Sequence, residues 1–315
     1  MTTSPDANNE WPALPYEAWR DTAQTLHLWL QIVGKILVAQ CPWVNHSWHV
    51  ALQITARGLG TRPIWHGAKA FQIEFDFVAH VLLIRVVGGG TISLPLVPQS
   101  TANFYRSLMR SLGQLNIPVK IHTMPNELPN PIAFDIDELH RSYDPVFANR
   151  YWRVLLQSER VFTRFRARFV GKCSPVHFFW GSADLAVTRF SGRTAPEHPG
   201  GVPHLPDWIA REAYSHEVSS AGFWAGSEQY PHPAFYSYAY PEPPGFAHAR
   251  VQPASAHYDT TLREFVLPYE SLRNAASPET DLFDFLQTTY EAAANLAKWD
   301  RSALERSPDF ASKAI

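Results

Sequence analysis

The side chains best suited to chemistry gather in one strand-like segment of the second half of the chain, residues 213–224. Tyr214, His216 and Ser220 alternate along one face of this segment, and Glu217 lies on the other face. Burying a polar group without a partner costs on the order of a few kcal/mol. Because neither face is apolar, the strand needs either satisfied hydrogen bonds or contact with ligand and water. We therefore predict a functional site in the second half.

General acid–base catalysis is the first chemistry that this segment suggests. An imidazole titrates near neutral pH, so His216 beside Tyr214 is suited to exchange protons with a substrate. Glu217 or Asp184 would orient the imidazole, and we predict His216, Glu217 and Asp184 as the catalytic residues. The alternative is a structural histidine whose hydrogen bonds are satisfied within the fold.

A metal-dependent hydrolase is a second hypothesis. A helical zinc site of the His-Glu-x-x-His type needs a second histidine, which the residues after Glu217 do not supply. No pair of histidines has ligand spacing, so we assign no metal ligand, although a site could still assemble across strands. The side chains available for it are His177, Asp184, His198, His204, His216 and Glu217.

Aromatic side chains predict a pocket for a small organic ligand. In residues 235–240 tyrosines alternate with smaller or apolar residues, which places a row of hydroxyls on one face. Such a row beside tryptophans suits a planar or polar ligand. Two alternatives stay open: an edge strand with half-exposed tyrosines, and a non-catalytic interaction protein that uses aromatic loops. The predicted ligand-binding residues are Trp180, Tyr214, Trp224, Tyr236 and His177.

The segment 176–190 also has strand character, and it raises a question of register. If it is one regular strand, His177 and Asp184 point to opposite sides of the sheet. A bulge at Gly181 and Ser182 would reset the alternation. The sequence therefore does not decide whether these two side chains share a site.

Internal similarity predicts that these elements belong to a duplicated unit. The helical pattern over 19–40 contains the pair Gly34-Lys35, and the one over 147–169 is followed by the pair Gly171-Lys172. The two pairs lie 137 residues apart. Residues 52–55 match 185–188 at an offset of 133, and a Leu-Pro pair recurs at an offset of 173. A further helical segment follows each Leu-Pro pair, over 101–115 and 278–298.

The increase in offset predicts about 40 additional residues in the second copy, mainly in 192–211 and 225–257. Long insertions of this kind form surface loops or site covers. The predicted domains are a tail over 1–10, a scaffold-like first repeat over 11–130, a second repeat with the pocket over 131–300, and a C-terminal tail over 301–315.

Strand patterns in the first copy define the fold class. Phe71, Ile73 and Phe75 alternate with Gln72 and Glu74, which is typical of a sheet with one buried face. Short connections between such strands favour antiparallel pairing. We predict an α+β fold with antiparallel sheets flanked by helices, in which a duplicated helix–strands–helix unit gives pseudo-two-fold symmetry.

Composition limits the partners and the compartment. The chain has 315 residues, 45% of them hydrophobic, and a formal net charge of −2, which argues against nucleic-acid binding. Two cysteines, no signal-like N-terminus and no apolar run of about 18 residues indicate a cytoplasmic protein without a membrane span. The expected partner is a small organic ligand. The sequence does not indicate a cofactor or an oligomeric state.

Several longer strings resemble a known family. They lie at residues 11–22, 27–35, 174–181, 188–193, 211–220 and 235–241. Together they resemble a bacterial family catalogued as a domain of unknown function (family 5996), and the resemblance covers nearly the whole chain. It implies a soluble bacterial protein, and it carries over no reaction, cofactor or catalytic residue.

Overall fold

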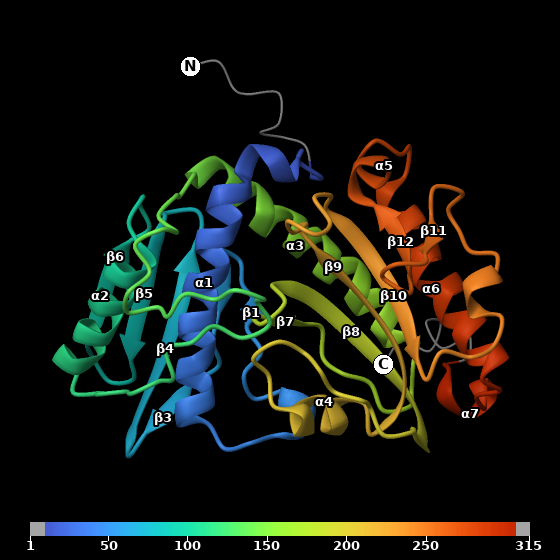
Figure 1. Ribbon diagram of the computed structural model, residues 1–315, viewed down its shortest axis with the longest axis horizontal. Helices are drawn as coiled ribbons and strands as arrows, with labels where there is room; N and C mark the ends of the chain where they lie inside the picture. Colours follow the sequence, from blue (N-terminus) through green and yellow to red (C-terminus); the bar gives the residue numbers. More distant parts are fainter. Residues whose placement is uncertain (1–9, 307–315) are drawn as a thin grey trace.

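The computed structural model describes residues 10–306 and contains two antiparallel sheets with helices packed against them (Figure 1). The α+β class with antiparallel sheets is therefore confirmed. The strands of the first sheet are β1 (Gln53–Ile54), β2 (Gly58–Gly60), β3 (Ile64–His66), β4 (Lys69–Asp76), β5 (Val81–Val86) and β6 (Thr91–Pro95). Those of the second are β7 (His177–Phe179), β8 (Asp184–Thr194), β9 (His216–Trp224), β10 (Ala234–Tyr240), β11 (His257–Asp259) and β12 (Glu264–Pro268).

The first sheet has the order β1-β2-β4-β5-β6, with β3 also paired to β4. Its apolar face packs on α1 (Tyr16–Gln40) and α2 (Thr101–Gln114). The ring of Phe104 in α2 stacks between Trp29 of α1, at 4.5 Å, and Phe75 of β4, at 6.3 Å between ring centroids. Ser100 caps α2 by accepting a hydrogen bond from the Asn103 amide, which fixes where that helix begins.

The second sheet has the order β11-β12-β10-β9-β8-β7. One face packs on α3 (Pro145–Ala167) and α6 (Pro278–Leu296). Phe162 of α3 contacts Phe235 of β10 at 6.2 Å between ring centroids, and Phe235 contacts Phe223 of β9 at 5.0 Å. Residues that alternate with these, such as Tyr236, lie on the opposite face.

The two sheets meet at their edges. The amide of Leu52, just before β1, donates to the carbonyl of Phe178 in β7, and the amide of Phe178 donates back, both at 2.9 Å. In Figure 1 the first sheet lies on the left and the second on the right, with α1 near the junction. The shorter helices are α4 (Asp207–Ala213), α5 (Tyr269–Arg273) and α7 (Arg301–Leu304), with 3₁₀ turns η2 (Asn45–Ser47) and η3 (Phe246–His248).

The segment 176–190 is not one strand. It is a hairpin in which β7 pairs antiparallel with β8, and Ala183 in the connection has a positive φ of 54°. His177 lies opposite Ala186, and Phe179 lies opposite Asp184. Since residues paired across strands share a face, His177 and Asp184 point to the same side of the sheet.

The other predicted elements match the structure to different degrees. The four long helices begin and end within a few residues of their predicted bounds. Of residues 52–55, which the repeat matches to 185–188, Gln53–Ile54 form the strand β1 and Leu52 forms an isolated bridge to Phe178. The described part of the predicted C-terminal tail contains α7, and Glu305 accepts a hydrogen bond from Tyr290 of α6 at 2.8 Å.

The internal duplication remains a prediction. A long helix precedes each sheet along the chain, and another helix follows it. However, the match at an offset of 133 aligns residues of β1 with residues of β8, which occupy different positions in their sheets. Among the described residues, no helix combines the length and apolar character that crossing a membrane requires.

Candidate functional site

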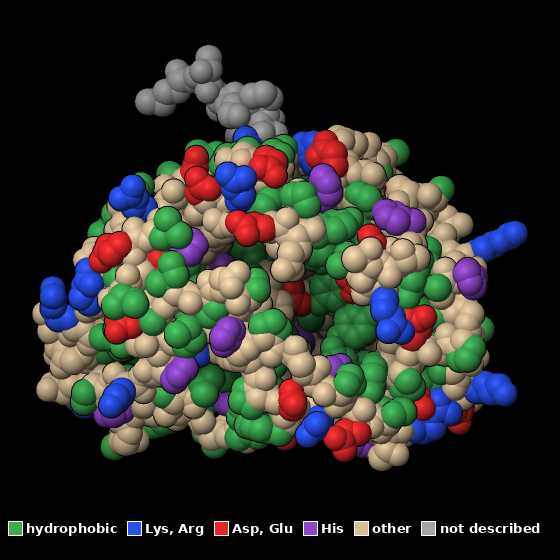
Figure 2. Space-filling model, in the orientation of Figure 1, with side chains coloured by type: hydrophobic (Ala, Val, Ile, Leu, Met, Phe, Trp, Pro, Cys, Tyr) green, Lys and Arg blue, Asp and Glu red, His purple; other side chains and the backbone are tan. Residues whose placement is uncertain are grey.

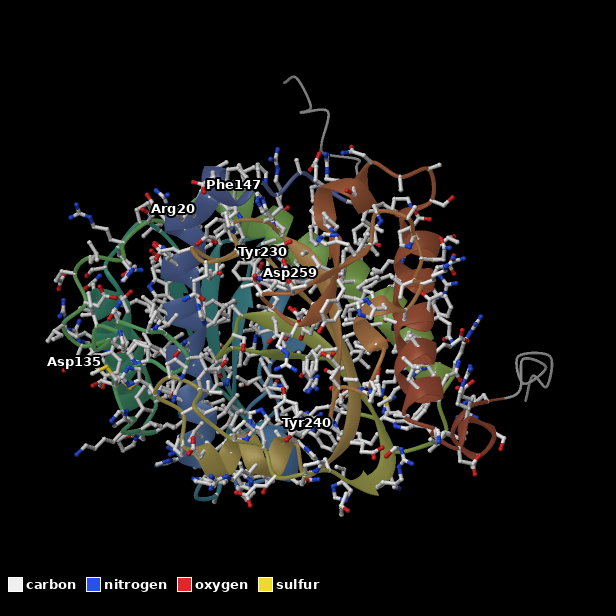
Figure 3. All side chains as sticks on the ribbon, turned by 45° about the vertical axis from the view of Figure 1, so that its right-hand side comes forward. Arg20, Asp135, Phe147, Tyr230, Tyr240 and Asp259 are labelled. Atoms are coloured by element: carbon white, nitrogen blue, oxygen red, sulfur yellow. The ribbon has the colours of Figure 1, made fainter. Side chains whose placement is uncertain are left out.

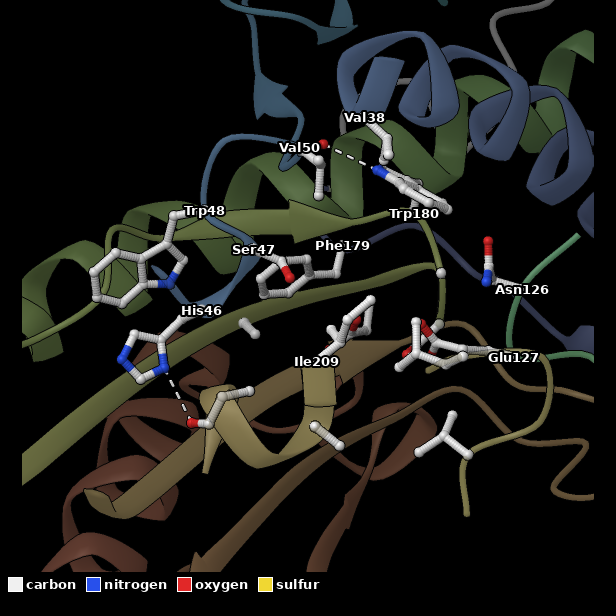
Figure 4. Close-up of a pocket in the computed structure, with 18 of the residues that line it drawn as sticks. Val38, His46, Ser47, Trp48, Val50, Asn126, Glu127, Phe179, Trp180 and Ile209 are labelled. Carbon is white, nitrogen blue, oxygen red and sulfur yellow. Dashed lines mark hydrogen bonds between the residues drawn. The ribbon is translucent and has the colours of Figure 1, made fainter. Parts of the chain in front are cut away.

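A cavity of about 760 Å³ lies against the face of the second sheet that α3 and α6 do not cover. Strands β7 to β10 form its floor, and the last turn of α1, helix α4 and the segments 43–50, 120–127 and 202–206 form its walls. Figure 2 shows the surface hollowed near the middle of this face of the molecule, and Figure 4 shows the wall residues at close range. The cavity therefore combines residues from both halves of the chain.

Helix α4 is attached to the segment 43–50 across the cavity. Trp43 donates from Nε1 to Glu212 at 2.9 Å, and its ring lies 4.6 Å from that of Trp208. Nδ1 of His46 donates to the carbonyl of Ala213 at 3.0 Å, the dashed contact in Figure 4. These contacts hold α4 as a cover over the polar face of the sheet.

Asp184 is the buried carboxyl group on the cavity floor. Its Oδ2 accepts a hydrogen bond from the hydroxyl of Tyr236 on β10. Burial is the main cause that raises the pKa of Asp184 to about 7, the hydrogen bond from Tyr236 opposes this shift, and the nearby charge of Glu127 adds to it. Gly222 on the intervening strand makes this arrangement possible, because a Cβ there would collide with the Tyr236 hydroxyl and the Leu185 carbonyl.

His177 presents a free lone pair on the same floor. Its Nδ1 lies 2.8 Å from the carbonyl oxygen of Ala186, which can only accept, so Nδ1 carries the proton. Burial lowers the pKa of His177 to about 4, and the ring is therefore neutral at pH 7. Its Nε2 is buried and has no hydrogen-bond partner in the described chain. A ligand that donates a hydrogen bond would satisfy this atom.

Hydroxyl groups continue the polar floor across β8, β9 and β10. Thr188 and Ser220 are hydrogen-bonded at 2.8 Å, and the hydroxyls of Tyr214 and Tyr238 are also 2.8 Å apart. All four residues line the cavity. Hydroxyls can both donate and accept, so this part of the floor adapts to either kind of ligand group.

Trp180 and Glu127 form the wall nearest to α1 (Figure 4). Trp180 donates from Nε1 to the carbonyl of Val50 at 3.0 Å, and its ring lies so close to Gly34 that a Cβ there would collide with it. Glu127 accepts a hydrogen bond from Ser182 at 2.5 Å, and burial raises its pKa. The wall therefore carries a second carboxyl group close to Asp184.

Of the predicted site residues, Trp180, Tyr214, Tyr236, His177 and Asp184 line this one cavity, whereas His216, Glu217 and Trp224 are not among its lining residues. His216 contacts the Ser215 hydroxyl at 3.1 Å. Glu217 lies on the other face of β9 and forms an ion pair with Arg193 at 2.6 Å, so it does not orient His216. Acid–base chemistry in the cavity would therefore depend on the carboxyl groups of Asp184 and Glu127 rather than on His216.

Trp224 lies beside the cavity floor and extends the aromatic surface. Its ring centroid is 5.4 Å from those of Tyr236 and Tyr230. Figure 3 shows Tyr230 near Asp259 and Tyr240 closer to α4. The ring of Tyr240 lies 5.2 Å from that of His198 between centroids, and its hydroxyl donates to the carbonyl of Pro196 at 3.1 Å. The aromatic row thus continues beyond the cavity itself.

The metal hypothesis gains no support from the structure. Within residues 10–306, no three side chains of His, Cys, Asp or Glu lie close enough together to hold a metal ion.

The sequence analysis missed the contribution of the first half. Lys35, Glu127 and the aromatic residues of the segment 43–50 line the cavity from regions that were predicted as scaffold. Gly34 and Lys35 were noticed only as one member of a repeated pair. No spacing relates Glu127 to Asp184, since they meet only through packing of the segment 120–127 on the second sheet.

One family model, described as a family of unknown function (DUF5996), matches residues 11–306. The chain therefore belongs to this family, as the strings quoted above suggested. No curated protein and no solved structure matches the chain.

Proposed function

We propose that this member of the DUF5996 family binds a small organic molecule in the cavity on the second sheet. The observation that carries the proposal is a cavity of about 760 Å³. Its floor is a face of the sheet that carries the polar side chains of Asp184, Ser220 and Tyr236. Ligand cavities commonly measure roughly 300–1,000 Å³ and combine apolar walls with a few convergent polar groups.

The balance of polar and apolar groups also supports binding of an organic molecule. The walls include Trp43, Trp48, Trp180 and Trp208, whose rings offer large flat surfaces that favour planar or partly apolar ligands. The buried Nε2 of His177 lacks a hydrogen-bond partner in the described chain. A ligand that donates a hydrogen bond to this nitrogen removes the cost of leaving a buried acceptor unsatisfied.

A fragment screen on the purified full chain tests the proposal. Binding is followed by thermal shift and by the intrinsic fluorescence of Trp43, Trp48, Trp180 and Trp208, all of which line the cavity. We expect several aromatic fragments to raise the unfolding temperature and to change the fluorescence.

Two variants of the same strand locate the binding. Ser220→Leu places a branched side chain into the cavity, and we expect at least about tenfold weaker binding of the fragments that bind the wild type. Glu217→Gln, on the opposite face of β9, is the matched control and should bind as the wild type does. Equal binding by all three proteins would contradict the proposal.

A further inference from the structure

The charged groups of the cavity restrict the chemistry of its ligand. Asp184 is 8% exposed, and its one hydrogen bond from a neighbouring side chain comes from the neutral phenol of Tyr236. Glu127 receives a hydrogen bond from the neutral Ser182. In the described part of the chain, neither carboxyl group forms an ion pair with a lysine, arginine or histidine. Two neighbouring carboxyl groups are thus removed from water without a compensating cation.

The two lysines that line the cavity do not supply that cation. Lys35 forms no ion pair with any residue of 10–306, and burial lowers its pKa to about 8, so its ammonium form is itself disfavoured there. Lys120 is exposed to solvent. Neither lysine contributes to the pKa of Asp184 or of Glu127. When Asp184 and Glu127 are ionised, no lysine of the cavity balances their negative charge, which leaves that role to a cationic ligand.

His177 adds an independent indication. Its protonated Nδ1 is bound to the Ala186 carbonyl, so the unpartnered Nε2, buried on the same face of the sheet as Asp184, can only accept. Three acceptors, namely this nitrogen and the two carboxyl groups, line one cavity. Aromatic rings such as Trp180 and Tyr236 stand beside them, and the faces of such rings attract cations.

We propose that the molecule bound in this cavity carries a protonated nitrogen, an ammonium or amidinium group, which Asp184 and Glu127 hold beside the aromatic walls. This inference rests on the proposed function, because it specifies the charge of the ligand of that same site. N–H groups of the cation would donate to the carboxylates, and one more donor on the ligand would satisfy Nε2 of His177.

The test compares three probes of nearly the same shape: phenethylamine, phenethyl alcohol and phenylacetate. Dissociation constants are measured by titration calorimetry at about pH 8, where Asp184, with a pKa of about 7, is largely ionised and the amine is protonated. We expect the amine to bind at least about tenfold more tightly than the alcohol, and the carboxylate to bind most weakly.

Variants then assign the preference to the carboxyl groups. Asp184→Asn keeps an acceptor for Tyr236, and it should reduce the preference for the amine over the alcohol by about tenfold while the alcohol binds as before. Glu127→Gln should reduce it in the same direction. Glu217→Gln, outside the cavity, should leave it unchanged.

The outcomes separate this inference from the proposed function. If the alcohol or the carboxylate binds as tightly as the amine, and Ser220→Leu abolishes that binding, the cavity binds ligands but the inference about charge is wrong. If the amine is preferred in the wild type and equally in Asp184→Asn and Glu127→Gln, the inference is also wrong. If no probe binds the wild type, or if every probe binds Ser220→Leu as tightly as the wild type, both proposals are wrong.

Discussion

In the first sheet, the strand face turned away from α1 and α2 carries Glu74 and Arg85, whereas the uncovered face of the second sheet carries Asp184 and Tyr236. Arg85 and Glu74 form an ion pair at 2.6 Å, and the arginine side chain is 46% exposed. Asp184 is buried on the cavity floor, and no cationic side chain within residues 10–306 forms an ion pair with it. The same alternation of polar and apolar residues therefore gives a solvated surface in one sheet and a closed polar cavity in the other.

The difference teaches that burial of the polar face, rather than its composition, distinguishes the two sheets. A charged pair at the surface contributes little to stability because water screens it. A carboxyl group that is shielded from water interacts more strongly with nearby charges and has a shifted pKa. Both properties are common in binding sites. The covering elements, α4 and the segment 43–50, thus matter as much as the strands.

The largest effect should come from the helix-covered face of the second sheet. Phe223 is fully buried and lies 5.0 Å from Phe235 and 5.7 Å from Tyr269 between ring centroids. Phe223→Ala should lower the free energy of unfolding by about 3–5 kcal/mol, because it leaves a void in the core. Urea denaturation measures this loss.

Ser220→Ala, on the cavity face of the same strand, is the comparison for that variant. It removes one hydroxyl from the contact with Thr188 and should cost about 1 kcal/mol. Similar losses for the two variants would mean that the two faces of β9 do not differ as described.

The pH dependence of stability should reveal the carboxyl group under the cover. Folding raises the pKa of Asp184 from 3.8 to about 7, so the folded protein binds a proton more tightly than the unfolded chain does. Wild-type stability should therefore fall as pH rises through this window. Asp184→Asn removes this titration, and relative to wild type it should gain roughly 2–4 kcal/mol between about pH 4 and pH 8.

Glu74→Gln provides the counterpart in the first sheet. This substitution removes the ion pair with Arg85, whose side chain is exposed to solvent. It should change the free energy of unfolding by less than about 1 kcal/mol at both about pH 4 and about pH 8. The free energy of unfolding of wild type and Asp184→Asn is measured by urea denaturation between about pH 4 and about pH 8. If the difference between the two proteins does not change with pH, Asp184 is not held in a buried position without a cation.

A smaller loss of stability is expected at Gly222, where the absence of a side chain lets Tyr236 lie close to the strand. In Gly222→Ala the new methyl group would meet the hydroxyl of Tyr236 and the carbonyl of Leu185, so Tyr236 must move away from Asp184. We expect a loss of about 1–3 kcal/mol in stability and weaker binding of the amine probe.

Gly89→Ala is the control, because it lies in the first sheet's β5–β6 turn and nothing would contact its Cβ. Differential scanning calorimetry compares the two variants. If Gly222→Ala were as stable as Gly89→Ala, the close approach of Tyr236 to the strand would be ruled out.

The sequence predicted much of this arrangement because local patterns carry it. Period-two alternation identified β4 and β10, and the spacing of apolar residues identified the long helices within a few residues of their ends. Five of the eight predicted site residues line the cavity. The alternation of tyrosines along residues 235–240 pointed to Tyr236, and Asp184 was predicted as a carboxyl group that could orient His216.

The errors arise where position depends on distant contacts. The sequence analysis places Glu217 and His216 on opposite faces yet predicts that Glu217 orients the imidazole; in the structure Glu217 pairs with Arg193 instead. The sequence does not decide whether His177 and Asp184 share a face, because its pattern does not distinguish a turn at residues 180–183 from a bulge.

The amino-acid sequence by itself determined the helices, the alternating strands and the unusual polarity of one strand face, since each depends on residues a few positions apart. Only the tertiary structure decided that this polar face is closed by α4 and by segments of the first half, and that Glu127 joins Asp184 there. The physical reason is that burial and charge proximity depend on distance in space, which local periodicity does not encode.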